Sequence, residues 1–341
     1  MKKNNSFRGM LLKVTAFAVM IVIASCSKTE NSVSEDASVI SGAGKNSAKV
    51  KYSNEVRKSG SNYVWRINNA DQGTTSSLST AINNAIGTGN REVHVLTGGT
   101  LSAQVNLKPG LTLYCHNVTF TKSHGGYGFY RDGSGGIKIY DFILNQSSGM
   151  GIRTSRASDI YIQNVRIYGG SIGIRIDSHP SRPYEDGRWV YRVHIQDCRF
   201  GYGSSHGLET YGVDGFKAYG IVARLMGECG VLLNKTRNGT MGTIDAYRCA
   251  TGTGYAGLRF ANNCSNITAN MLYATECGRG YFVLSGSNNC HLNNARIVNG
   301  TGIGVWLENV TNCTVKAGCT NDGVAVSGSG SWANVSTSGC P

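Results

Sequence analysis

The chain has 341 residues, 46 of them glycine and only four proline, and a formal net charge of +13. This length leaves room for one large domain, and the lack of heptads or long amphipathic runs after residue 100 excludes a coiled coil or a helical bundle. A basic surface suits an anionic partner, such as an acidic glycan, a nucleic acid or an anionic membrane.

Residues 1–25 have the features of an export signal. A basic segment precedes an apolar stretch that is too short to remain as a membrane helix. The stretch ends in Ile23-Ala24-Ser25-Cys26, which resembles the lipobox of bacterial lipoproteins, where the cysteine is lipidated. An ordinary secretory signal is the alternative. We expect an exported protein, held at the bacterial outer membrane or cell surface only by a lipid on Cys26.

Removing the four basic residues of this signal from +13 leaves a charge of +9 on the mature chain. Export argues against nucleic acid as the partner, so we expect an anionic polysaccharide and a monomeric protein. Residues 26–60 are rich in Ser, Asn, Lys and Glu, which predicts a flexible tether. Residues 61–341 then form the folded domain.

The domain is predicted to begin with a short helix over residues 74–86. Apolar residues recur there at helical spacing, and Gly87 follows as a stop. We expect this helix to cap the open end of a strand stack, which would otherwise expose a bare sheet edge. The stretch Glu92-Val-His-Val-Leu is predicted to start the first coil of that stack.

A glycine-led pattern then recurs at spacings of 23, 22, 34, 23, 27, 23 and 24 residues. Each glycine is followed by alternating inward and outward residues, a polar turn and a second short strand. A repeat this short cannot bury its own apolar face, so it must stack on its neighbours. This predicts an all-β fold, a single-stranded right-handed parallel β-helix. The leading glycines are Gly128, Gly151, Gly173, Gly207, Gly230, Gly257, Gly280 and Gly304.

Asparagines and cysteines recur near the turns of these repeats. The asparagines are expected to form side-chain ladders: Asn164, Asn238, Asn263, Asn289 and Asn312. Ten cysteines remain after Cys26, an even number that permits disulfides in an exported chain. Cys264, Cys290 and Cys313 occupy similar repeat positions, which fits an interior stack equally well. The cysteine spacing indicates no metal site, and we expect no cofactor.

The single spacing of 34 residues predicts an insertion of about eleven residues at Ser178–Trp189. Two of the four prolines lie in it, so it should form a loop. It leaves the coil just before the repeat that carries His206 and Tyr211. We interpret it as a wall or lid over a cleft, with a neutral surface insertion as the alternative.

The second residue after each leading glycine should point outward, which predicts an outward column along the stack. Guanidinium groups pair with carboxylates, and aromatic faces can support sugar rings. The column therefore indicates a surface for an acidic glycan: Tyr130, Arg153, Arg175, Glu209, Leu232, Arg259, Phe282 and Trp306. A second outward column contains Asp132, Ser155, Asp177, Tyr211 and Asn234.

The segment Gly203–Gly239 gathers ionisable residues in two consecutive repeats. Tyr211 and Lys235 fall one residue out of register on adjacent rows, so their ends can converge. Such a cluster suits β-elimination from a uronic acid: a cation neutralises the carboxylate, a base removes the C5 proton and an acid protonates the leaving oxygen. The predicted catalytic residues are Lys235, Tyr211, His206 and Arg237. Lys235 or His206 would be the base and Tyr211 the acid, or Tyr211 would serve both steps.

Residues 60–340 resemble the right-handed parallel β-helix polysaccharide lyases. The runs Ser205-His-Gly-Leu-Glu-Thr-Tyr-Gly-Val-Asp-Gly and Gly230-Val-Leu-Leu-Asn-Lys-Thr-Arg-Asn are similar to a group of β-helical alginate lyases, polysaccharide lyase family 31. The resemblance implies a catalytic Lys and Tyr without an essential metal, with the Lys on Lys235. It leaves the Tyr open between Tyr211, Tyr184 and Tyr202. Substrate-binding candidates are Arg153, Arg175, Glu209, Arg259, Tyr130, Asn234 and Tyr184.

Other readings of the same residues remain. A calcium-dependent pectate lyase would use Asp177, Glu209 and Asp214, but arginines surround them. Polygalacturonases need paired aspartates, which are missing here. Mannuronan C5-epimerases share the first chemical step, and Tyr211-Gly-Val-Asp214 is similar to the start of their motif. A glycan-binding β-helix without catalysis would keep the arginine column alone. We expect a lyase acting without a metal, with alginate as its substrate and calcium not favoured.

Overall fold

The computed structural model describes residues 51–340 except residues 186 and 253. The chain divides into two units at Val50, and only the second is described. The predicted signal peptide, Cys26 and most of the tether therefore lie outside the described residues. The fold starts earlier than the predicted boundary after residue 60, because β1 (Glu55–Ser59) pairs with β2 and β4. Among the described residues, every helix is too short or too polar to span a membrane.

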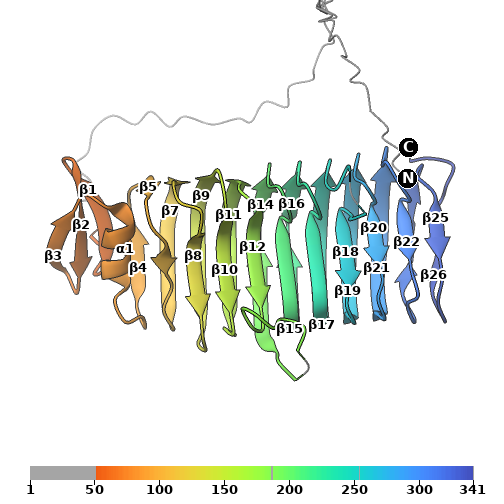
Figure 1. The fold of residues 1–341 in the computed structure, drawn as a ribbon, viewed down its shortest axis with the longest axis horizontal. Helices are drawn as coiled ribbons and strands as arrows, with labels where there is room; N and C mark the ends of the chain where they lie inside the picture. Colours follow the sequence, from red (N-terminus) through yellow and green to blue (C-terminus); the bar gives the residue numbers. More distant parts are fainter. Residues whose placement is uncertain (1–50, 186, 253, 341) are drawn as a thin grey trace, which may run out of the picture. The chain divides into compact units, whose positions relative to one another are not determined.

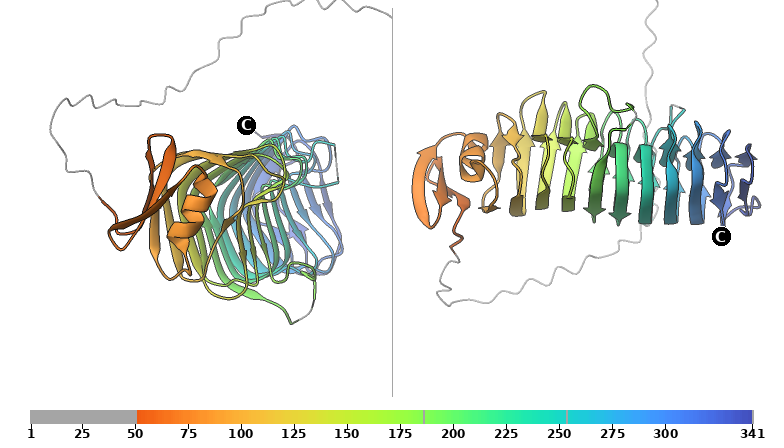
Figure 2. Two further views of the ribbon diagram at one scale, coloured as in Figure 1. Left: turned by 60° about the vertical axis from the view of Figure 1, so that its left-hand side comes forward. Right: turned by 90° about the horizontal axis from the view of Figure 1, so that it is seen from below.

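The predicted capping helix is confirmed, but it begins at Leu78 and not at Thr74, because Thr74 and Thr75 belong to a strand. Three strands, β1, β2 (Asn62–Ile67) and β3 (Ala70–Thr75), form an antiparallel meander before α1 (Leu78–Ile86). The hydroxyl of Ser77 accepts a hydrogen bond from the Thr80 N–H, and the Gly87 N–H donates to the Asn83 carbonyl. The apolar residues of α1 are fully buried. The helix lies across the open end of the coil stack (Figure 2).

After α1 the chain winds into a parallel β-helix of about ten turns, which confirms the predicted fold class (Figure 1). Strands that follow one another at the spacing of the repeat pair in parallel, and they form three faces. Several long strands bend at a corner and contribute to two faces.

Face A holds the glycine-led strands: β6 (Val105–Asn106), β8 (Tyr127–Asp132), β10 (Met150–Ser155), β12 (Ile172–Asp177), the first parts of β15 (Leu208–Tyr219) and β17 (Val231–Tyr247), β18 (Leu258–Ala261), β20 (Tyr281–Val283), β22 (Val305–Leu307) and β25 (Val324–Val326). Face B holds β4 (Glu92–Val95), β13 (Val190–Gln196), β23 (Thr314–Val315), β26 (Trp332–Ala333) and parts of β7 (Leu111–Lys122), β9 (Ile137–Gln146), β11 (Ile160–Gly169), β15, β17, β19 (Ser265–Thr275) and β21 (Asn288–Val298). Face C holds β5 (Gly99–Leu101), β14 (Arg199–Gly201), β16 (Ile221–Arg224), β24 (Gly318–Thr320) and the remaining parts of the long strands.

The close stacking of backbones on face A explains why glycine leads each repeat. A Cβ on Gly151 would lie 2.7 Å from the carbonyl oxygen of Gly173, and one on Gly173 would lie 2.5 Å from that of Gly207. The same contact recurs from Gly128 to Gly280, each glycine facing the carbonyl of the next leading glycine. A side chain at these positions would push the rows apart. We call this series the glycine ladder.

The interior is filled by aliphatic and phenylalanine side chains, with cysteines among them. Eight of the described cysteines are free and buried, and they include Cys264, Cys290 and Cys313, as the interior-stack interpretation requires. Cys319 and Cys340 form a disulfide, so the bridging interpretation holds for this pair.

Asparagine ladders run along one corner, as expected. Asn238 donates to Asp214, Asn266 donates to Asn238 and Asn289 donates to Asn266, over 2.7–3.2 Å. These three asparagines have positive φ angles of 50–54°, a conformation that asparagine tolerates well. The ladder member in this repeat is Asn266, so the expectation of Asn263 was wrong by three residues.

The glycine ladder makes a stability prediction. Gly151→Ala should lower the free energy of unfolding by about 1–3 kcal/mol, because the new methyl group would clash with the Gly173 carbonyl oxygen and the Ile167 side chain. Gly125→Ala is the matched control, since the nearest atom to its Cβ lies 4.0 Å away. Urea unfolding of both variants gives the comparison. Equal midpoints for the two variants would contradict the steric explanation.

Candidate functional site

The predicted outward column on face A is confirmed by the strand register. Tyr130 pairs with Arg153, Arg153 with Arg175, and Arg175 with Glu209. The column continues through Leu232, Arg259, Phe282 and Trp306. Tyr211 pairs with Asn234, so Lys235 lies one residue beyond it at the corner of the coil. The backbone therefore brings the predicted site residues onto neighbouring rows.

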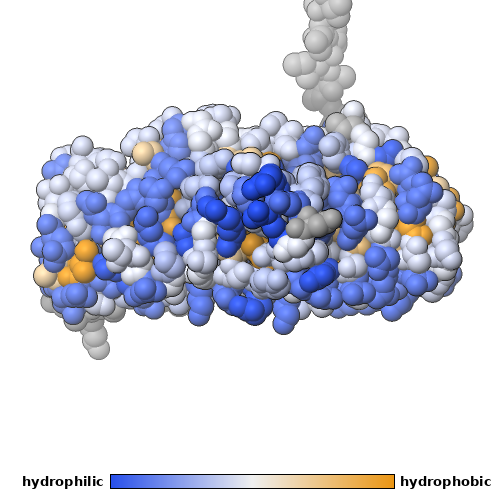
Figure 3. All heavy atoms as spheres, turned by 60° about the horizontal axis from the view of Figure 1, so that its bottom comes forward, coloured by the Kyte–Doolittle hydropathy of each residue, from blue (hydrophilic) through white to orange (hydrophobic). Residues whose placement is uncertain are grey.

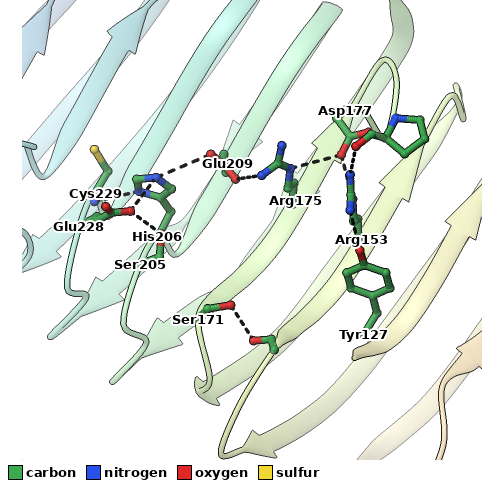
Figure 4. Close-up of polar contacts among 12 residues, drawn as sticks. Tyr127, Arg153, Ser171, Arg175, Asp177, Ser205, His206, Glu209, Glu228 and Cys229 are labelled. Carbon is green, nitrogen blue, oxygen red and sulfur yellow. Dashed lines mark hydrogen bonds and ion pairs between the residues drawn. The ribbon is translucent and has the colours of Figure 1, made fainter. Parts of the chain in front are cut away.

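A row of alternating charges crosses the middle of face A (Figure 4). Arg153 Nε donates to Asp177 Oδ2 over 3.0 Å, and Arg175 Nε donates to the same oxygen over 3.3 Å. Arg175 also pairs with Glu209 at 3.2 Å, and His206 Nε2 lies 3.6 Å from the other oxygen of Glu209. The five side chains are buried or nearly so, which strengthens their mutual attraction. We call this series the charged row.

Arg153 is tied into the protein on three sides. Besides Asp177, it donates to the Tyr127 hydroxyl over 2.6 Å and to the Pro180 carbonyl over 2.9 Å. Pro180 belongs to the insertion, so Arg153 fixes the start of that loop. This geometry makes Arg153 a support for the site more than a direct substrate contact.

His206 is held in one tautomer. Its Nδ1 accepts the Cys229 N–H over 3.1 Å, so the proton resides on Nε2, which faces Glu228 at 3.1 Å. Burial, together with the positive charges of Arg259 and Arg175, lowers the pKa of His206 to about 3. At neutral pH the ring is therefore uncharged, and both of its nitrogens already have partners.

Tyr211 lies against the charged row and the insertion. The Arg175 guanidinium sits 4.7 Å from the centre of its ring, and the Tyr184 ring meets it edge-on at 4.9 Å. Burial raises the pKa of the Tyr211 hydroxyl, and the nearby carboxylate of Glu209 raises it further. Burial likewise raises the pKa of Glu209, against the opposing effect of Arg175. The Tyr211 phenol therefore keeps its proton at neutral pH.

Lys235 holds the middle of the insertion. This residue is only 7% exposed, and its Nζ donates to the backbone carbonyls of Tyr184 and Glu185. Its ammonium lies 5.3 Å from the centre of the Trp189 ring, and the Arg237 guanidinium lies 4.0 Å from that ring. Arg237 also pairs with Asp214 at 2.9 Å. The loop at Ser178–Trp189 is thus confirmed, and it projects beyond the coil (Figure 1).

A pocket of about 480 Å³ opens between this loop and the following rows. Hydrophilic side chains gather around the middle of this side of the molecule (Figure 3). The pocket combines two cations, two aromatic rings, two amides and two hydroxyls: Lys235, Arg237, Tyr184, Trp189, Asn262, Asn263, Ser265 and Ser285. Sequence reasoning missed Trp189, although it ends the predicted insertion, and it missed the pocket's serines, which carry no distinguishing pattern.

The remaining candidates lie at different distances from this pocket. Tyr130 stacks on Tyr127 with ring centres 4.8 Å apart, three rows before Glu209. The buried Asn234 accepts a hydrogen bond from Asn262 over 2.7 Å. Tyr202 is 68% exposed and follows β14 at another corner, so the structure brings Tyr184 rather than Tyr202 to Tyr211.

The carboxylates of the calcium alternative are paired with arginines. Asp177 contacts Arg153 and Arg175, Glu209 contacts Arg175, and Asp214 contacts Arg237. Within the described part of the chain, no three His, Cys, Asp or Glu side chains gather in a way that could hold a metal ion.

Comparison with known proteins supports the fold. The structure resembles tailspike protein 2 of the Escherichia coli O157:H7 bacteriophage CBA120, with a TM-score of 0.56, 14% identity and 80% of this chain covered. The enzymatically active domain of the same tailspike gives a TM-score of 0.55, 13% identity and 84% coverage. The chain spans 41% and 50% of the length of these two tailspike structures.

The A-module of a mannuronan C-5 epimerase from Azotobacter vinelandii matches with a TM-score of 0.42, 15% identity, 77% of this chain and 93% of the module. No model of a protein family matches the chain, and no curated protein matches it. At these identities the similarity to the tailspike structures shows the β-helix fold alone.

The depressed pKa of His206 makes a pH prediction. Unfolded histidine binds a proton near pH 6.5, whereas folded His206 stays neutral down to about pH 3. Acidification between these values therefore favours the unfolded state, by up to about 1.4 kcal/mol per pH unit. His206→Asn keeps an acceptor for the Cys229 N–H but cannot titrate. Between pH 7 and pH 5 the wild type should lose about 2 kcal/mol more stability than this variant in urea unfolding. Parallel losses would contradict the assignment.

Proposed function

We propose that this protein is a polysaccharide lyase that cleaves a uronic-acid polymer by β-elimination. The observation that carries the proposal is the pocket beside the insertion. Its cations suit a carboxylate, its aromatic rings suit a sugar face, and its amides and hydroxyls suit sugar hydroxyls. A phenol with a raised pKa adjoins it. The fold shared with an enzymatically active tailspike domain is compatible with such a role.

The first requirement of β-elimination is a neutralised substrate carboxylate, since this makes the C5 proton acidic. Arg237 reaches the pocket with one side of its guanidinium engaged by Asp214, and its other donors remain for a carboxylate. Trp189 packs under this guanidinium and fixes its plane. We assign Arg237 as the group that binds the uronate carboxylate.

The proton transfers are assigned to Lys235 and the Tyr211–Tyr184 pair. In this scheme Lys235 first releases a proton to solvent. The resulting amine removes the C5 proton, and the electron pair forms the C4–C5 double bond while the C4–O4 bond breaks. The tyrosine pair donates a proton to O4, and Arg175 beside the Tyr211 ring stabilises the phenolate left behind. Proton transfer from the ammonium of Lys235 to this phenolate restores the starting state.

His206 and Glu209 have a positioning role in this scheme. Both nitrogens of His206 are engaged, so the ring does not offer a lone pair to a substrate. Glu209 is held between Arg175 and His206 and faces Tyr211, which orients the phenol. This differs from the sequence-based hypothesis of His206 as a base, and it favours Lys235 among the two candidates.

Alginate is the substrate we propose first, on the sequence resemblance to alginate lyases. We propose that the protein acts on it outside the cytoplasm, exported and anchored through Cys26. An exported enzyme meets such polymers where they occur.

The lyase proposal predicts a rise in ultraviolet absorbance on alginate, because elimination creates an unsaturated uronate. Tyr211→Phe and Lys235→Met should each lower the rate at least 100-fold, the usual contribution of general acid–base catalysis. Tyr184→Phe tests whether the proton passes through the second phenol, and Tyr202→Phe should leave the rate unchanged. Polymannuronate, polyguluronate, pectate, glucuronan and chondroitin sulfate complete the panel.

The matched controls are Tyr191→Phe and Lys217→Met, which change exposed side chains on face B. Equal losses in these controls would show that the effects are not specific to the site. A flat trace on every polymer would refute the lyase proposal. C5 proton exchange without cleavage would then identify an epimerase, and retention on the polymer without either reaction would identify a binding protein.

Metal removal gives a separate prediction. Arginines already neutralise the three carboxylates that could have held calcium, so EDTA should leave the rate on alginate unchanged. The assay compares EDTA-treated enzyme with the same sample after calcium is restored. A rate that is lost with EDTA and recovered with calcium would contradict this prediction.

A further inference from the structure

A second group of cations lies on face A, beyond the row of Lys235. The Arg259 guanidinium sits 4.6 Å from the centre of the Tyr255 ring and 5.1 Å from that of Phe282. The Arg279 guanidinium sits 4.6 Å from Phe282 and 4.4 Å from Trp306. The Phe282 and Trp306 rings stack with centres 5.0 Å apart. We call these five residues the arginine–aromatic group.

The two arginines of this group lack the partners that the earlier arginines have. Arg153 and Arg175 pair with Asp177 and Glu209, whereas no ion pair forms at Arg259 or Arg279 among the described residues. Arg279 does donate to the Gly254 carbonyl. The Nε of Arg259 is buried and has no hydrogen-bond partner in the described part of the chain.

Both guanidinium groups are partly buried and have no carboxylate partner among the described residues, so this arrangement suits an anionic ligand. Burial lowers the pKa of Arg279, and the charge of Arg259 lowers it further, while Glu308 opposes the shift without forming an ion pair. Phe282, between the two guanidinium groups, is buried, and the partly exposed ring of Trp306 adds an apolar surface beside Arg279. An anion attached to a ring-shaped apolar body matches both features, and an acidic sugar is such a ligand.

The arginine–aromatic group is continuous with the candidate site. The Tyr255 ring meets the His206 ring at 5.4 Å, and His206 contacts Glu209 of the charged row. Arg259 pairs with Leu232, which pairs with Glu209, so Arg259 lies two rows away, or about 10 Å at the usual strand spacing. Trp306 lies two rows further along the same column.

We propose that the arginine–aromatic group is a distal subsite, which binds a second acidic sugar of the polymer held in the pocket. This rests on the proposed function, because it assigns the same polymer to both places. The carboxylate of that sugar would meet Arg259 and Arg279, and its ring would lie against Trp306. On the other side of the site, carboxylates already neutralise Arg153 and Arg175. The polymer would therefore be bound toward the later rows.

The test is affinity electrophoresis in gels that contain polymannuronate, with carboxyl-reduced polymannuronate as the neutral counterpart. Arg279→Gln should raise the apparent dissociation constant for the acidic polymer about tenfold, the usual effect of losing one charge-assisted contact. Binding to the neutral polymer should not change. Trp306→Leu keeps an apolar side chain without a flat ring, and it should weaken binding to both polymers.

Arg248→Gln is the matched control. Arg248 also lies over an aromatic ring, Tyr247, but it pairs with Glu276 at 3.4 Å. Both variants lose one positive charge, so the general attraction to a polyanion falls equally. Equal retardation of Arg279→Gln and Arg248→Gln would overturn the subsite. A flat ultraviolet trace with retardation that still depends on Arg279 would instead refute the lyase proposal while leaving this binding group in place.

Discussion

The contact of each leading glycine with the carbonyl of the next row is the constraint on which the rest of the structure depends. Because no Cβ intervenes, the rows on face A stack without lateral shift over eight repeats. Every outward side chain then lies above its counterpart in the next row. The charged row and the arginine–aromatic group both need this alignment, since their members come from different repeats.

The sequence was sufficient to predict this alignment because the glycine ladder is local and repeated. Counting two residues from each leading glycine predicted the outward column from Tyr130 to Trp306, and the register confirms every step. The insertion was predicted from one irregular spacing. The capping helix was predicted from apolar spacing and a terminal glycine. Each of these features is determined by a short stretch of the sequence, which is why it could be predicted.

The partners of individual side chains could not be predicted in this way. Arg153 is held by the Pro180 carbonyl, and Lys235 by the carbonyls of Tyr184 and Glu185, groups that any loop sequence carries. The tautomer of His206 depends on the backbone of Cys229 in the next row. Backbone partners leave no residue pattern, so the sequence predicted which side chains gather but not which were already engaged.

Charge pairing divides face A into two parts that differ in their electrostatics. Buried ion pairs contribute little net stability, because desolvation offsets their attraction, but they fix geometry when every member has a partner. The charged row behaves in this way and orients Tyr211 and the loop. Beyond Lys235, aromatic rings replace carboxylates beside the guanidinium groups, and the surface changes from a scaffold into one that can bind anions.

The insertion interrupts a surface that is otherwise periodic. The rows of face A are about 4.8 Å apart, a distance that is set by the strand spacing and held constant by the backbone contacts. A polymer has its own repeat length, so its units align with the rows of side chains only at certain places along the solenoid. The loop between Asp177 and Val190 leaves the solenoid at one fixed row. The loop is therefore a fixed reference point along the solenoid, and the distance of every later contact residue from it is set by the number of rows between them.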